Sequence, residues 1–174
     1  MAIITFRKAR LYIKDGGVGT AQNSIEVNLG EGSMSWTRAR TVNYKMNRGA
    51  LDEVTEGDDI PLEVTFSAQF LHYTANAVSG ADPTPIDALW NEGAASAWVS
   101  SDSDTCRLPA VDLALEYHPD CDPGTVKPWE TITFPDFRIE GESGDVSMDD
   151  GTLEFSGKCN AVKPTAVREA YTSA

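Results

Sequence analysis

Cysteine and histidine are scarce in this sequence, and their scarcity excludes several kinds of site. The chain has three cysteines and two histidines in 174 residues. An odd cysteine count without paired spacing is not a disulfide framework. A zinc site of Cys106, Cys121, Cys159 and His118 is one interpretation, but zinc ligands normally come in close pairs, so we favour ordinary thiols. His72 and His118 match no catalytic or metal-binding motif. The sequence thus predicts no enzyme, no metal and no cofactor.

Long apolar runs and basic residues are also lacking. No run of about 18 apolar residues occurs, which excludes a membrane-spanning helix. The first ten residues lack the apolar core of a secretory signal, so we expect a protein of the cytoplasm. Fourteen basic residues stand against 27 acidic ones, for a net charge of −13. Specific nucleic-acid binding is therefore disfavoured, because it needs a clustered basic surface.

The few basic residues gather at one end of the chain. Residues 1–48 hold eight of the fourteen, with only three acids, so this part carries +5 and the remainder −18. Such asymmetry is typical of a charged partner surface. In a strongly acidic protein, one obvious partner is a second copy of the same chain.

A period of two dominates the pattern, which predicts a mainly β protein in a single domain over residues 1–174. Strands are expected at 3–13, 24–29, 111–117, 131–140 and 153–162, with a polar turn at 141–151. Pro135 predicts an edge or a bulge in its strand. A capping box at Thr84 predicts one short helix over 84–92. The expected fold is a β-sandwich or barrel with a flanking helix.

The most informative segments are 35–48 and 61–73, which predict a long two-faced hairpin arm over 35–73. One face is mainly apolar but carries arginines; it holds Trp36, Arg38, Arg40, Tyr44, Arg48, Leu62, Val64, Phe66 and Phe70. The other face is polar and holds Glu63, Thr65, Ser67 and Gln69. The segment between the strands, 49–60, is interpreted as an exposed acidic loop with Asp52, Glu53, Glu56, Asp58 and Asp59.

Two functions could use such an arm. Arms of several subunits could join into one large barrel with a water-filled bore, or a single arm could enter a bilayer. The arginines on the apolar face decide against lipid, where each costs about 2–4 kcal/mol near the midplane. A polymeric tube is therefore preferred, with the polar face towards the bore.

The same segments resemble a known family. Residues 36–45 (WTRARTVNYK), 48–59 (RGALDEVTEGDD), 61–66 (PLEVTF), 84–90 (TPIDALW), 134–138 (FPDFR) and 150–160 (DGTLEFSGKCN) are similar to the major tail tube proteins of long-tailed, non-contractile bacteriophages. The resemblance covers most of the chain between about residues 24 and 164.

The resemblance implies a structural virion protein whose rings, expected to be hexameric, stack into a tail tube. Each subunit would give four strands to an inner barrel, and the genome would pass through the bore without specific binding. Other copies of the chain and the tail-tip, tape-measure and tail terminator proteins are the implied partners, with no membrane. The location is then the virion tail, after assembly in the bacterial host cytoplasm.

The charge asymmetry adds a hypothesis about contacts between rings. We expect the acidic segment 49–60 to meet a basic surface of Arg7, Lys8 and Arg10 on another copy. The alternative function is a non-polymerising β-sandwich that binds a carbohydrate or receptor through Trp98 and Trp129. Core packing is the more common fate of such tryptophans.

Overall fold

The computed structural model describes residues 9–27, 29, 33–69, 83–117, 130–146 and 151–168. Its strands are β1 (Ala9–Lys14), β2 (Ser24–Val27), β3 (Met34–Thr37), β4 (Arg40–Asn47), β5 (Ala50–Asp59), β6 (Leu62–Gln69), β7 (Val111–Tyr117), β8 (Glu130–Val146), β9 (Gly151–Cys159) and β10 (Thr165–Arg168). The helix α1 (Pro85–Trp90) and the 3-10 turns η2 (Gly19–Ala21) and η4 (Gly93–Ala95) complete the described elements. The predicted mainly β fold is confirmed.

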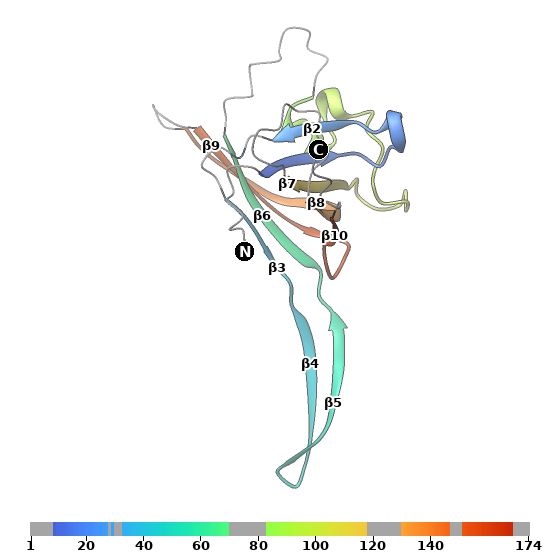
Figure 1. Ribbon diagram of the computed structural model, residues 1–174, viewed down its shortest axis with the longest axis vertical. Helices are drawn as coiled ribbons and strands as arrows, with labels where there is room; N and C mark the ends of the chain where they lie inside the picture. The colour runs from blue at the N-terminus through green and yellow to red at the C-terminus, as the bar shows by residue number, and fades with distance from the viewer. Residues whose placement is uncertain are drawn as a thin grey trace, which may run out of the picture.

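Eight of these strands form one antiparallel sheet: seven follow the order β2-β1-β7-β8-β9-β6-β3, and the eighth, β10, pairs with β8. β10 continues the line of β9, since both pair with β8 opposite β7. Figure 1 shows β3, β6 and β9 running obliquely across β1, β2 and β7, so the two ends of the sheet lie over one another as a β-sandwich. We call this part the body.

The core of the body follows from strand alternation. Leu62, Val64 and Phe66 of β6 are buried, as the two-faced pattern predicts, while Glu63 and Thr65 between them are exposed. The Phe66 ring lies 5.2 Å from that of Phe155 across the strand pair. Burying one such aromatic side chain contributes about 1.5–3 kcal/mol, so this row contributes strongly to the stability of the core.

β8 departs most from the expected strands. It runs to Val146, so most of the polar turn predicted at 141–151 is strand, paired with β9 up to Val146–Gly151. Those residues lack an alternating apolar pattern, and β9 holds them by backbone hydrogen bonds. The bulge predicted at Pro135 is confirmed, because the β7–β8 register shifts there and Asp136 has a φ of +50°. Proline has no N–H to donate to a neighbouring strand, so it is tolerated where the hydrogen bonds between the strands are already interrupted.

The helix is confirmed with its predicted cap. The Asp87 N–H donates to Thr84 Oγ1 at 3.2 Å, and the Thr84 N–H donates to Asp87 Oδ2 at 3.0 Å. The helix ends earlier than predicted, at Trp90, because Asn91 adopts the left-handed conformation of a C-cap. It lies against the sheet, where the Trp90 indole N–H donates to Glu142 of β8 at 2.9 Å.

β4 and β5 form a separate two-stranded sheet that projects from the body (Figure 1). The predicted acidic loop over 49–60 is therefore wrong: most of it is strand β5, which pairs with β4 up to Asn47–Ala50. The turn is only Arg48-Gly49, with φ of 50° and 84°. Positive φ at both central residues is the geometry of the two-residue hairpin turn that favours a tight reversal.

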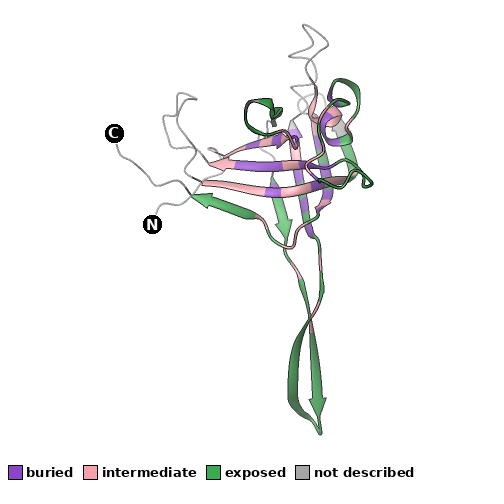
Figure 2. Cartoon of the chain, turned by 90° about the vertical axis from the view of Figure 1, so that its right-hand side faces the viewer, coloured by how far each residue is buried: buried purple, intermediate pink, exposed green. Residues whose placement is uncertain are grey.

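Residues 38–39 separate β3 from β4, and residues 60–61 separate β5 from β6. These two breaks divide the long hairpin into a part that projects and a part that belongs to the body. Pro61 has no N–H to donate to a strand ladder, and the next residue already belongs to the body, since the Leu62 N–H donates to the Ala161 oxygen at 2.9 Å. We call residues 38–60 the arm. Its strands of 8 and 10 residues reach about 30 Å at about 3.4 Å per residue, and Figure 2 shows it almost wholly exposed.

Candidate assembly surfaces

One face of the body is a four-stranded polar surface across β3, β6, β9 and β8. Alternation turns small polar and charged side chains outwards here, opposite the buried row. We call this surface the polar face; it consists of Ser35, Thr37, Glu63, Thr65, Ser67, Glu140, Ser143, Glu154, Ser156 and Lys158. It includes three of the four residues predicted to face a bore, while the side chain of Gln69 lies outside the described residues.

The polar face has an excess of negative charge. The Lys158 ammonium lies 3.4 Å from Glu140 and 3.9 Å from Glu63, which leaves Glu154 without a basic neighbour among the described residues. Ion pairs of this exposure contribute about 0–1 kcal/mol, so their charges stay accessible to solvent. An open hollow of about 200 Å³ lies beside Gly141, and its lining includes Thr65, Glu142, Glu154 and Phe155.

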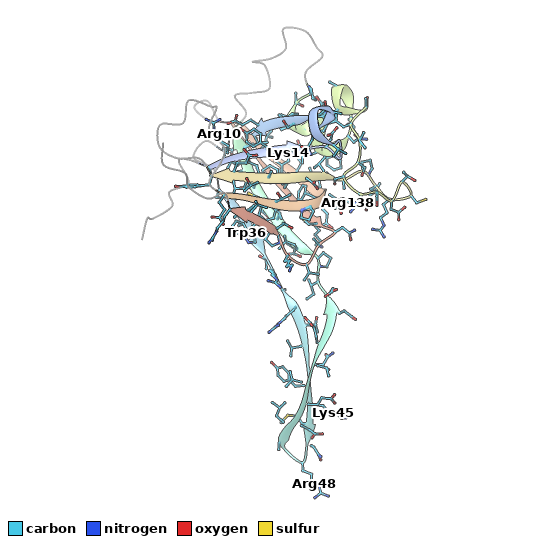
Figure 3. The ribbon with its side chains drawn as sticks, turned by 45° about the vertical axis from the view of Figure 1, so that its right-hand side comes forward. Arg10, Lys14, Trp36, Lys45, Arg48 and Arg138 are labelled. Carbon is cyan, nitrogen blue, oxygen red and sulfur yellow. The ribbon has the colours of Figure 1, made fainter. Side chains whose placement is uncertain are left out.

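Arg138 does not add a free positive charge to this face. Its guanidinium donates to the Asp102 carboxylate and, at 3.0 Å, to the Leu108 carbonyl oxygen. The Asp104 N–H and then the Arg138 guanidinium lower the pKa of Asp102 below its usual value. The loop that carries Asp102 is thus tied to β8 at the end of the polar face (Figure 3).

The four-stranded segment has two edges without a strand partner among the described residues. β3 is the last strand of the sheet and pairs only with β6. β7 covers β8 only as far as Phe137, so residues 138–146 of β8 pair with β9 alone. Edge N–H and C=O groups of this kind are ready to pair with another strand.

The arm carries exposed apolar side chains on one face. Tyr44 faces Val54 and Met46 faces Leu51 in the cross-strand register, so these pairs lie on the same side. We call them, with Val42, the apolar stripe. Their exposed fractions are 66% for Tyr44, 60% for Met46, 57% for Leu51 and 52% for Val54. A contiguous exposed apolar surface of this kind marks a contact site.

The other predicted site residues are distributed between arm and body. Trp36 lies on the body, half exposed, with its ring 5.3 Å from that of Phe134. Arg38, Arg40 and Arg48 are exposed on the arm. Phe70, Arg7 and Lys8 lie outside the described residues, and Arg10 lies 3.9 Å from Glu26.

The sequence signal missed for the arm was Gly49. A glycine between two polar strands marks a tight turn as readily as the start of a loop. The acidic residues assigned to that loop, including Asp52, Glu53 and Glu56, instead project from β5.

The alternative sites considered from the sequence gain no support from the described residues. Cys106 is an exposed thiol and Cys159 a buried one, whereas Cys121 and His118 lie outside the described residues. No group of three His, Cys, Asp or Glu side chains in the described part could hold a metal ion. Nor does that part contain a helix long and apolar enough to cross a bilayer.

No family model matches this sequence, and no curated protein is similar to it. Solved structures are similar in fold. A chain of the sheath/tube terminator of the PVC extracellular contractile injection system has a TM-score of 0.55 at 10% identity, covering 96% of this chain and 98% of its own. The chain has a tail-tube-like fold.

Two further structures extend the likeness. A chain of the PVC sheath–tube complex has a TM-score of 0.55 at 11% identity over 96% of this chain and 93% of its own. A chain of the tube-terminating cap of the anti-feeding prophage has a TM-score of 0.55 at 8% identity over 97% and 93%. The likeness therefore extends over nearly the whole chain, and at these identities it is a likeness of fold.

Proposed function

We propose that this chain is the major tail tube protein of a long-tailed, non-contractile bacteriophage. In this role it has a structural rather than a catalytic function and forms stacked hexameric rings. The observation that carries the proposal is the four-stranded polar face with an unpaired strand edge on each side, in a tail-tube-like fold. The non-contractile assignment rests on the sequence resemblance.

The two edges suggest how a ring closes. The β3 edge of one subunit would pair with residues 138–146 of β8 in the next, so that each subunit gives four strands to a continuous inner barrel. Such a contact joins two different surfaces and generates a ring when the rotation closes. Pairing also satisfies the backbone groups that the free subunit leaves open.

The polar face would then line the bore. Its carboxylates, with Glu63 and Glu154 among them, would repel the phosphates of passing DNA, and salt screens this repulsion beyond about 10 Å at about 0.1 M. DNA would slide through without specific binding. Tail-tip, tape-measure and terminator proteins would meet the ends and the interior of the tube in the virion tail, after assembly in the host cytoplasm.

The binding-module alternative loses one of its two supports. Trp98 is partly buried and packs against the core, so it is no open stacking platform. Trp129 lies outside the described residues.

Electron microscopy of the purified protein over a concentration series, with light-scattering mass, tests the proposal. Hollow rods or rings of uniform width are expected. A particle that stays monomeric at every concentration, and also after a preformed tail-tip complex is added as an initiator, would refute the proposed function.

A further inference from the structure

Most basic side chains of the described body form ion pairs within the chain. Basic side chains there that lie within 4.0 Å of a carboxylate are Arg10, Lys14, Arg107, Arg138, Lys158 and Arg168. On the arm only Lys45 does so, 3.6 Å from Glu53. Arg38, Arg40 and Arg48 of the arm therefore have no ion-pair partner among the described residues of their own subunit.

The unpaired charges of the arm are sorted by strand. The three arginines belong to β4 and its flanks, which hold no acid, whereas Asp52, Glu56, Asp58 and Asp59 belong to β5, which holds no base. One long edge of the arm is therefore basic and the other acidic.

The two edges also match in height along the arm. Near the body, Arg40 of β4 faces Asp59 of β5. At the tip, Asn47 faces Ala50, so Arg48 and Asp52 both lie within two residues of this pair. If a second arm lies beside the first in the same direction, its basic groups meet acidic groups at both levels. The labelled Arg48 at the far end of Figure 3 marks the tip level.

We propose that the acidic β5 edge of one arm lies against the basic β4 edge of the arm of another copy of this chain. This inference rests on the proposed self-assembly and names the contact that the arm makes in it. A two-fold arrangement would set β4 against β4 or β5 against β5 and bring like charges together. The charge pattern therefore selects a head-to-tail contact, which forms a ring or a continuing filament.

The contact runs through side chains rather than through a strand ladder. The β4–β5 register shifts twice, and β5 carries the extra residue each time. Bulges of this kind interrupt edge pairing, whereas long arginine and glutamate side chains reach across an irregular edge. Such a contact is sensitive to salt.

Charge reversal on each edge tests the contact. R40E/R48E places acidic side chains on the β4 edge at the body level and at the tip level, and D52K/D59K places basic side chains on the β5 edge at the same two levels. We expect each variant alone to need a concentration at least about tenfold above wild type for rods to form, because like charges then meet at both levels of the contact. An equimolar mixture restores assembly near the wild-type concentration, because the two variants alternate.

Two further variants sharpen the result. The combined variant R40E/R48E/D52K/D59K should assemble with itself but not mix with wild type in the same rods, as measured with two fluorescent labels. The matched control K45E/E53K reverses a pair that is satisfied within one arm and should assemble like wild type. Because the arm is a separate sheet, the melting temperature of the body is expected to stay unchanged in all variants.

The outcomes separate the two proposals. Wild-type protein that never polymerises refutes the proposed function and this contact with it. Wild type that polymerises, with a mixture of the two reversed variants that fails while both remain folded, refutes the arm-to-arm contact alone. That result would assign the arm charges to the body of a neighbour, whose charges the variants leave unchanged.

Discussion

Replacing Tyr44 with serine removes the largest side chain of the apolar stripe. Tyr44 is 66% exposed in the subunit and faces Val54 on the arm. An aromatic side chain has about 150–250 Å² to bury, so the exposed two-thirds amounts to about 100–165 Å². At about 25 cal/mol per Å² its burial on assembly contributes about 2.5–4 kcal/mol for each subunit contact.

Tyr44→Ser should therefore raise the concentration needed for rod formation by about 60-fold or more, at about 1.4 kcal/mol for each factor of ten. The stability of the body should change by less than about 0.5 kcal/mol, because an exposed substitution outside its core removes no buried contact. Sedimentation of rods over a dilution series measures the first quantity, and thermal unfolding of dilute subunits measures the second.

Asn43→Ser is the matched control, since Asn43 adjoins Tyr44 on β4 but faces Thr55 on the opposite side of the arm. It should leave the concentration for assembly within about threefold of wild type, because no large apolar area is lost. If Tyr44→Ser stays within the same range, the apolar stripe is not buried on assembly and the reasoning fails.

Three predictions concern the body. Burial, opposed in part by the hydrogen bond from the Asp136 N–H, raises the pKa of Asp112. The folded protein therefore loses stability as pH rises from the usual pKa of an aspartate through this raised pKa. The melting temperature of Asp112→Asn should accordingly gain on that of wild type between pH 4 and pH 7. Gly157→Ala should destabilise by about 1–3 kcal/mol in denaturant unfolding, because its Cβ would lie 2.1 Å from a backbone oxygen of β8; a wild-type midpoint would contradict this. Burial also raises the pKa of the Cys159 thiol to about 12, so a thiol reagent at pH 8 should label Cys106 in the folded protein and Cys159 only after unfolding, as read by peptide mass.

The body was largely predictable from the sequence because its strands have a core to face. Residues 62–68 alternate between apolar and polar side chains, and the structure buries the apolar ones. The helix was predictable because Thr84 and Asp87 form a local capping box that needs no tertiary contact. In both cases the residues that form the sequence pattern are also the residues whose burial or hydrogen bonding stabilises the element.

The arm was only partly predictable, because β5 has no core to face. Its order depends on backbone pairing with β4 and on a turn at Arg48-Gly49. An acidic segment with a glycine at position 57 then looks like a loop, since hydrophobic alternation is the main strand signal. The end of β8 was missed for the same reason: residues 141–146 are held by pairing with β9.

The two bulges of β5 bear on the solubility of the subunit. A long, flat hairpin with an apolar face is a template for cross-β aggregation, in which identical strands stack without limit. Each extra residue in β5 bends and twists the strand and breaks the even spacing of its N–H and C=O groups. An arm of this shape is therefore a poor template for amyloid-like growth, even though its apolar stripe is exposed.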